Sequence, residues 1–174
     1  MHGIRISSLQ IIKHPDPRLR KRSAPVEKFG DELTRLAHRM FQLMHENKGV
    51  GLAAPQVGLN LRLFVFNVTG EPGDDTAVVN PRLTDLEGES AAEEGCLSIP
   101  DVTVTMSRAE RCTLTGHDLE GKPIRLNGVD LAARCWQHEC DHLDGKLIID
   151  HMSEADKIAN RKAIRKLEEA DRKR

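Results

Sequence analysis

Residues 130–145, DLAARCWQHECDHLDG, contain the pattern from which the interpretation of this chain starts. We predict a helix from about Asp130 to His142, with Gly145 just past its end, because glycine commonly follows the last turn of a helix. His138 and His142 stand four residues apart, so they share one helix face with about 5–6 Å between their Cβ atoms. Two imidazoles so placed can bind one metal ion, and Glu139 lies within reach of a water on that ion. The stretch therefore predicts metal-assisted hydrolysis with a carboxylate as general base.

Around this central helix, the sequence predicts further helices near both ends of the chain and strands between them. Asp31 begins an amphipathic helix that ends near Asn47. Its apolar positions recur at helical spacing: Leu33, Leu36, Ala37, Met40, Phe41 and Met44. Strand-like stretches follow: 62–68, 77–79, 102–107, 111–115 and 123–126. Ser153 begins the last helix, with Asp156 at its third position as a partial capping box.

The order of these elements predicts the fold class. The strands cluster together instead of alternating with helices, which favours α+β with antiparallel pairing over a doubly wound sheet. We therefore expect mainly antiparallel sheets packed around the central metal-binding helix, with an N-terminal helix and a charged C-terminal helix over 153–174. No repeat or linker divides the chain, so we expect one domain over 1–174.

The composition narrows the class of protein. Hydrophobic residues make up 39% and charged residues 30% of the 174 residues, as in a soluble globular protein. The net charge of −1 gives no field that would attract DNA or a membrane surface. No apolar run approaches the roughly 20 residues that span a bilayer. The start, MHGIRISSLQ, lacks the apolar region of a secretory signal, so we expect a cytoplasmic protein with no membrane or DNA partner.

Two histidines do not complete a metal site, so a third ligand is needed. In the longer zinc-peptidase motif the last histidine would fall at the position of Ile148, and Glu168 and Glu169 lie in a strongly charged helix that suits a buried ligand poorly. Among the cysteines, Cys140 lies two residues from each histidine and faces away from them. Cys135 tilts towards the helix N-terminus, beyond reach of the ion.

Of the two remaining cysteines, Cys112 sits in a plain strand-like run and is expected to be a small core residue. Cys96 lies in Glu93-Glu94-Gly95-Cys96-Leu97-Ser98, a turn that could present both a thiolate and backbone amides. A buried free thiol is the alternative at this position. A third feature, GVGLAAPQVG at 49–58, combines small residues with the lone amide of Gln56, and by itself is only a glycine-rich turn.

Taken in order, these three segments resemble the signature motifs of the peptide deformylase family. The matching stretches are GVGLAAPQ at 49–56, EGCLS at 94–98 and QHECDHLDG at 137–145. The likeness extends to HPDPRLRKRSAPVEKF at 14–29, NPRL at 80–83 and GKLIIDHMS at 145–153, and so covers nearly the whole chain. The resemblance implies an enzyme that removes the formyl group from the N-terminal formyl-methionine of nascent peptides and releases formate.

The resemblance also implies a role for each matching residue. It implies that Cys96, His138 and His142 hold the metal and that Glu139 is the general acid and base. It further implies that Gln56 and the backbone amide of Leu97 stabilise the oxyanion. The residues it implies for the substrate pocket are Val50, Gly51, Gly95, Leu131 and Cys135. One thiolate and two imidazoles suit zinc by ligand preference, whereas the resemblance implies Fe2+, with Zn2+ or Ni2+ able to substitute.

Three positions depart from the family pattern and affect the expected shape of the substrate pocket. Thr103 stands where many bacterial members have an arginine, and His151 stands where relatives often have an aromatic residue. Arg134 replaces an apolar residue that often lines the methionine pocket, and we expect its stem to pack with the charged head at the pocket rim. A role for Glu94 or Asp141 around the metal ligands stays unassigned.

The last predicted helix is strongly charged. Residues 153–174 carry eight Lys/Arg against five Asp/Glu, a net +3, which is typical of a solvated helix. The family resemblance implies a weak ribosome contact through this helix.

The alternatives to a deformylase are a zinc peptidase of the HExxH type and a non-catalytic relative that acts as a binding module.

Overall fold

The computed structural model describes residues 5–173, and within them it confirms the predicted α+β class. The three α-helices are α1 (Asp31–Glu46), α2 (Asp130–Leu143) and α3 (Glu154–Asp171). The strands are β1 (Gly51–Ala53), β2 (Leu63–Phe66), β3 (Thr76–Glu87), β4 (Ser90–Cys96), β5 (Ile99–Arg108), β6 (Arg111–His117) and β7 (Pro123–Val129). Short 3-10 helices are η1 (Ile6–Ser8), η2 (Pro17–Arg20), η3 (Ala54–Val57) and η4 (Ile148–His151).

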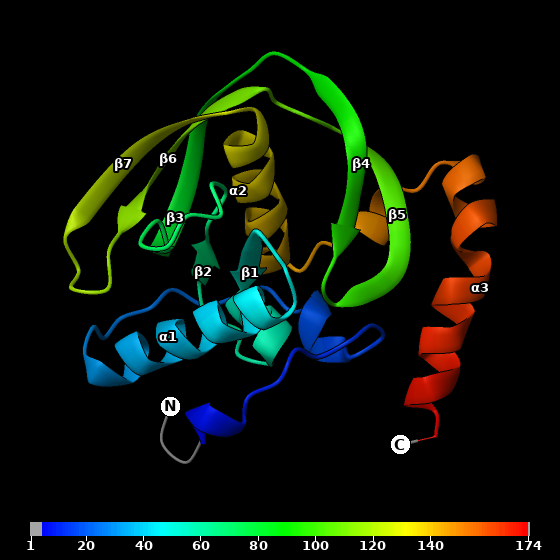
Figure 1. The fold of residues 1–174 in the computed structure, drawn as a ribbon, viewed down its shortest axis with the longest axis horizontal. Helices are drawn as coiled ribbons and strands as arrows, with labels where there is room; N and C mark the ends of the chain where they lie inside the picture. Colours follow the sequence, from blue (N-terminus) through cyan, green and yellow to red (C-terminus); the bar gives the residue numbers. More distant parts are fainter. Residues whose placement is uncertain (1–4, 174) are drawn as a thin grey trace.

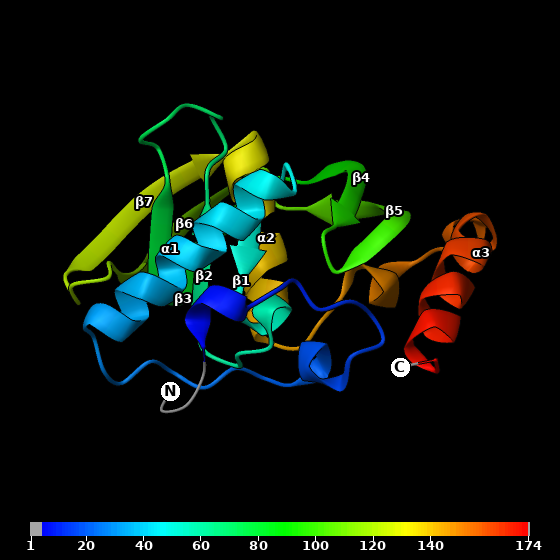
Figure 2. The ribbon, with the colours of Figure 1, turned by 60° about the horizontal axis from the view of Figure 1, so that its bottom comes forward.

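The strands form two separate antiparallel sheets with α2 between them. The larger sheet has the order β1-β2-β3-β6-β7, and β4 and β5 form a hairpin of their own. Figure 1 shows α2 between the larger sheet and the β4–β5 hairpin, as the prediction of a central helix requires. Figure 2 shows α1 crossing in front of the larger sheet and α3 beside the hairpin, at the far edge of the molecule.

Apolar faces of the helices hold the two sheets around α2. The predicted apolar face of α1 is buried against the larger sheet, with Leu36 and Met40 fully enclosed. Trp136 on α2 packs edge-on against Phe66 of β2. Burial of each such large side chain contributes roughly 1.5–3 kcal/mol. This packing fixes α2, and therefore the histidines that it carries, against a rigid support.

Strand β5 shows the alternation that its sequence predicts. Val102, Val104 and Met106 are buried under the hairpin, while the residues between them face solvent. The hairpin packs on α3 and on η4, and apolar side chains of α3 join the same cluster as the buried face of β5. Ser153 caps α3 as predicted, because its Oγ accepts a hydrogen bond from the Asp156 amide at 3.1 Å.

The stretch 49–58, interpreted as a glycine-rich turn, contains strand β1, and two further predictions about the strands were wrong. The stretch expected to stop at Val79 continues through Pro81 to Glu87, because Asn80 adopts a left-handed conformation and forms a bulge. The Asn80 side chain stabilises this bulge by bonding to both backbone groups of Val26. The second error concerns residues 93–98, which were predicted to form a turn. The residues up to Cys96 belong to strand β4, which local sequence patterns did not reveal.

A glycine follows the C-terminal end of α2 and forms the turn there. The helix ends at Leu143, and Gly145 follows in a left-handed conformation with φ of 74°. A Cβ at this position would lie 2.5 Å from the carbonyl oxygen of Arg20, so only glycine fits the turn.

Within residues 5–173, no helix has the length and apolar character that crossing a membrane requires.

Candidate metal centre

Three side chains from two elements converge at the point where α2 meets the hairpin. The two Nε2 atoms of His138 and His142 lie 3.2 Å apart, and the Cys96 Sγ lies 3.3 Å from the His142 Nε2. All three donor atoms lie within 4.8 Å of one another. Ligands at about 2.0–2.3 Å from one tetrahedral ion are roughly 3.3–3.6 Å apart. The donor set and its spacing therefore fit a metal ion, with the remaining position open.

The hairpin decides which cysteine joins the histidines. Cys96 is the last residue of β4 and pairs with Ile99 across a tight turn, which places its thiol at the end of the strand nearest α2. Cys112 is a core residue, and neither Cys135 nor Cys140 belongs to the metal-ligand group of the described chain. Burial raises the pKa of the Cys140 thiol to about 12, so this side chain remains protonated.

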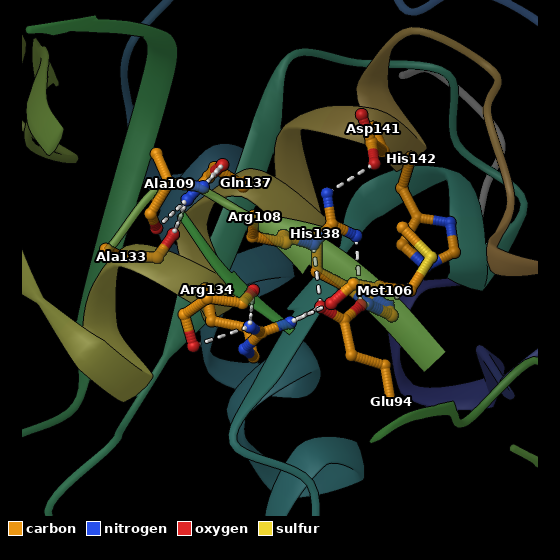
Figure 3. A network of polar contacts seen from close by, with 11 residues as sticks. Glu94, Met106, Arg108, Ala109, Ala133, Arg134, Gln137, His138, Asp141 and His142 are labelled. Carbon is orange, nitrogen blue, oxygen red and sulfur yellow. Dashed lines mark hydrogen bonds and ion pairs between the residues drawn. The ribbon is translucent and has the colours of Figure 1, made fainter. Parts of the chain in front are cut away.

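A buried carboxylate orients the first histidine. Glu94 is 7% exposed, and its Oε2 accepts a hydrogen bond from Nδ1 of His138 at 2.9 Å. Arg108 donates to both oxygens of Glu94, at 2.7 and 2.9 Å, and to Asp141 at 2.7 Å (Figure 3). Burial alone would raise the pKa of Glu94, but the hydrogen bonds from His138 and Arg108 hold it well below its usual value. The Nε2 atom of His138 is thereby free to face the metal.

Arg108 is a residue of this site that the sequence analysis missed. It lies at the end of β5 among other charged residues, so no local pattern separates it from a surface arginine. Pairing of the two hairpin strands places Arg108 opposite Ser90, and from there its side chain reaches Glu94, fourteen residues earlier in the chain.

Arg134 departs from its predicted position. Its charged head was expected at the pocket rim, but it turns into the protein and donates to Glu94 at 2.8 Å and to the Ser90 carbonyl at 2.7 Å. The side chain is only 14% exposed. The guanidinium pairs there with a buried carboxylate, and a buried charge left without a partner is strongly unfavourable.

The side-chain amide of Gln56 lies next to Cys96. Gln56 belongs to η3 and is 1% exposed; its Oε1 accepts from the Ala53 amide at 2.9 Å. Its Nε2 donates to Ser98 Oγ at 3.2 Å and lies 3.6 Å from the Cys96 Sγ. Lys13 Nζ donates to the Leu97 carbonyl, which ties the turn after Cys96 to the N-terminal segment. The glycine-rich segment and the cysteine turn therefore meet at one point.

Glu139 is buried beside the metal ligands with part of its carboxylate unpaired. It is 4% exposed, and its Oε2 has no hydrogen-bond partner in the described part of the chain. Burial raises its pKa to about 7. A carboxylate with this pKa exchanges a proton readily at neutral pH, as a general acid and base must.

An open pocket of about 390 Å³ leads to these groups. It is lined by all five residues predicted for it, Val50, Gly51, Gly95, Leu131 and Cys135, together with Gln56, Cys96, Leu97, His138 and Glu139. Thr103 and His151 lie outside its lining. The backbone of Thr103 instead bonds to the Asn160 side chain on α3, at 3.2 and 2.7 Å.

A Cys-His-His group, a buried glutamate and an amide at the end of an open pocket define the class of a metal-dependent hydrolase. The model of the polypeptide deformylase family matches residues 8–158. The chain belongs to the polypeptide deformylase family. This confirms the family predicted from the three motifs.

The relatives match over nearly their whole length. The peptide deformylase of Alkalilimnicola ehrlichii is 43% identical over 160 residues, covering 91% of this chain and 90% of that protein. The crystal structure of a peptide deformylase from Legionella pneumophila has a TM-score of 0.88 at 40% identity, covering 95% of this chain and 98% of that one. The peptide deformylase from Plasmodium falciparum has a TM-score of 0.88 at 34% identity, with 92% and 96% covered.

Proposed function

We propose that this chain removes the formyl group from the N-terminal formyl-methionine of newly made polypeptides and releases formate. The observation that carries the proposal is the meeting of Cys96, both histidines of α2 and the Gln56 amide at one end of an open pocket. These groups come from three separate segments of the chain. Membership of the deformylase family supplies the reaction, and the pocket supplies room for a peptide end.

The metal would be held by Cys96, His138 and His142. A bound ion would lower the pKa of a water molecule and polarise the formyl oxygen. We propose Fe2+ as the native metal, following the family resemblance, with Zn2+ or Ni2+ able to substitute. Burial and the neighbouring His138 lower the pKa of His142, so its ring is neutral, which is the form that coordinates a metal.

Glu139 would move the proton during the reaction. Its unpaired Oε2 and its place in the pocket lining support this role. It takes a proton from the attacking water and returns that proton to the amide nitrogen as the C–N bond breaks. Formate and a free amino terminus result, so the atoms of water are divided between the two products.

Gln56 and Leu97 would stabilise the negative charge that develops on the formyl oxygen. Gln56 cannot swing freely, because its own Oε1 is held by the Ala53 amide. Its Nε2 is therefore held in place before substrate arrives, which is the condition for effective stabilisation of a transition state. The Leu97 amide follows directly after the Cys96 ligand.

The pocket mouth is suited to an apolar side chain such as that of methionine. Val50 and Leu131 lie at the pocket and are 42% and 48% exposed, which leaves apolar surface available to a substrate. Gly51 and Gly95 present backbone without side chains in the same lining. We therefore propose that these residues, with Cys135, bind the first residue of the peptide.

Two further expectations remain predictions. We propose that the C-terminal segment 153–174, which includes α3, contacts the ribosome weakly, and its net charge of +3 supports this. We also propose a cytoplasmic location without DNA or membrane partners, which the composition and the proposed nascent substrate support.

Formate release tests the proposed function directly. The protein is purified without oxygen, its metal content is measured, and formate is followed with formyl-Met-Ala-Ser and with unformylated Met-Ala-Ser. We expect formate from the first peptide alone, and its near-complete loss in Glu139→Gln with metal still bound. No formate with any of Fe2+, Ni2+ or Zn2+ would refute the proposal. Cleavage of internal peptide bonds would favour the zinc peptidase instead.

A further inference from the structure

Arg134 lies on α2 one turn before His138 and reaches both strands of the hairpin. Its Nη1 donates to Glu94 Oε1 at 2.8 Å and to the Met106 carbonyl at 3.1 Å, and its Nη2 donates to the Ser90 carbonyl at 2.7 Å. Figure 3 shows the guanidinium of Arg134 pointing towards Glu94, while Asp141 lies beyond the Arg108 guanidinium. One side chain therefore joins the helix to the first strand, the second strand and the buried carboxylate.

The contacts of Glu94 show what Arg134 adds. Oε1 accepts from Arg108 and Arg134, and Oε2 accepts from Arg108 and His138. A carboxylate offers about four acceptor positions, so all of them are used. Rotation of the carboxylate would break several charge-assisted bonds at once, which keeps the bond to His138 in place.

Arg134 brings a second positive charge to this network. Arg108 and Arg134 oppose Glu94 and Asp141. Without Arg134, the buried Glu94 would share the single guanidinium of Arg108 with Asp141. An uncompensated buried charge is strongly unfavourable.

The two elements joined by Arg134 are the ones that supply the metal ligands. Cys96 ends β4, whereas His138 and His142 lie on α2. Metal ligands must be held within about 0.5 Å of their working geometry. A bond between α2 and β4 therefore bears directly on the distance between the thiol and the imidazoles.

We propose that Arg134 is a positioning residue for the metal centre, which acts through Glu94 to hold His138 and to fix β4 against α2. The inference rests on the proposed function, because it concerns the metal site of that same reaction. In this role Arg134 acts on Glu94 and not on the reacting atoms. Arg134 also lines the pocket.

Nickel affinity of the apo-protein tests this role without relying on turnover. Ni2+ is titrated into the full-length chain in competition with a chelator, and the thiolate-to-nickel absorption band reports the Cys96 bond. We expect Arg134→Met to bind Ni2+ about 10–100-fold more weakly, as loss of a group that orients a ligand generally does. Arg134→Lys keeps the charge and should recover part of this loss. Arg111→Met removes a surface arginine paired with Glu87 and should bind Ni2+ normally.

A double-mutant cycle separates this role from a general effect on folding. If Arg134 acts through Glu94, its replacement should change Ni2+ affinity less than about threefold in a Glu94→Gln background, because coupled residues are not additive. An equal effect in both backgrounds would overturn the inference. If Arg134→Met does not fold, the same cycle is run with Arg134→Lys, and an additive effect there would overturn it equally.

Turnover distinguishes the inference from the proposed function. At saturating metal we expect Arg134→Met to lower kcat more than it raises KM. Normal Ni2+ affinity with a change in KM alone would show that Arg134 only lines the pocket, and would refute the inference while formate release stands. A wild-type protein that binds Ni2+ but releases no formate would refute the function and leave the affinity comparison valid.

Discussion

Glu94 Oε2 lies 2.9 Å from Nδ1 of His138, on the ring nitrogen that does not face the metal centre. An ionised carboxylate only accepts hydrogen bonds, so His138 carries its proton on Nδ1 and presents the lone pair of Nε2 to an ion. The Nε2 atom in turn lies 3.2 Å from Nε2 of His142. The buried carboxylate therefore determines how the first histidine is used.

Acid should weaken the folded protein through this carboxylate. The pKa of Glu94 is lowered in the folded state from the usual 4.5, so its contribution is fully present above that value and is lost as the pH falls below it. Arg108→Met removes the main partner and should destabilise the protein by about 3–5 kcal/mol at pH 7. It should also flatten the dependence of unfolding free energy on pH below about 4.5. Urea unfolding at pH 7 and pH 4 measures both effects, and an unchanged pH dependence would contradict the prediction.

Replacement of the thiol ligand should remove the metal. Cys96→Ser exchanges a thiolate for a hydroxyl that stays protonated at neutral pH, so we expect metal content to fall to a small fraction of wild type. Elemental analysis of the purified protein measures this. Cys140→Ser is the matched control, since its thiol is outside the metal-ligand group, and it should keep full metal content. Intact metal in Cys96→Ser would instead point to a different third ligand, as a zinc peptidase requires.

The four thiols should differ in reactivity once the metal is removed. Burial raises the pKa of Cys112, of Cys135 and of Cys140, the last to about 12, so these side chains stay protonated at pH 8. The thiolate is the reactive form, and Cys96 opens into the pocket. We expect iodoacetamide to modify Cys96 first in the metal-free protein and to modify no thiol rapidly in the metal-loaded protein. Peptide mass spectrometry identifies the site, and early modification of Cys140 would contradict this order.

A single methyl group at Gly51 should disturb the catalytic carboxylate. A Cβ at this position would lie 2.5 Å from Glu139 Oε1 and 2.8 Å from the Cys135 Sγ, so one of these groups must move. We expect Gly51→Ala to lower kcat on the order of 100-fold, with metal retained, because small displacements at a reacting centre are costly. Gly70→Ala, at a turn with nothing within 4 Å, should keep wild-type kcat and cost of order 1 kcal/mol in stability. Equal kcat in both variants would show that Glu139 tolerates the shift.

Local patterns predicted the elements well where one face is buried. The apolar residues of α1 recur with the period of a helix, and those of β5 alternate as in a strand with one buried face. Both predictions were confirmed. The strand β4 was missed because its exposed face and its glycine resemble a turn. The extension of β3 was missed because Asn80 and Pro81 resemble a strand end, whereas Val26 supplies partners that stabilise a bulge there.

By itself, the sequence determined the chemical groups of the site: two histidines on one helix face, a glutamate between them, and motifs that name a cysteine and a glutamine. Spacing along a helix is a local property, so four residues suffice to place His138 and His142 together. Only the tertiary structure decided that Arg108 and Arg134 meet on Glu94, because one comes from the partner strand of the hairpin, 14 residues away, and the other from a helix, 40 residues away. Long side chains can reach many partners, and the choice among them depends on which buried charge the fold leaves within reach.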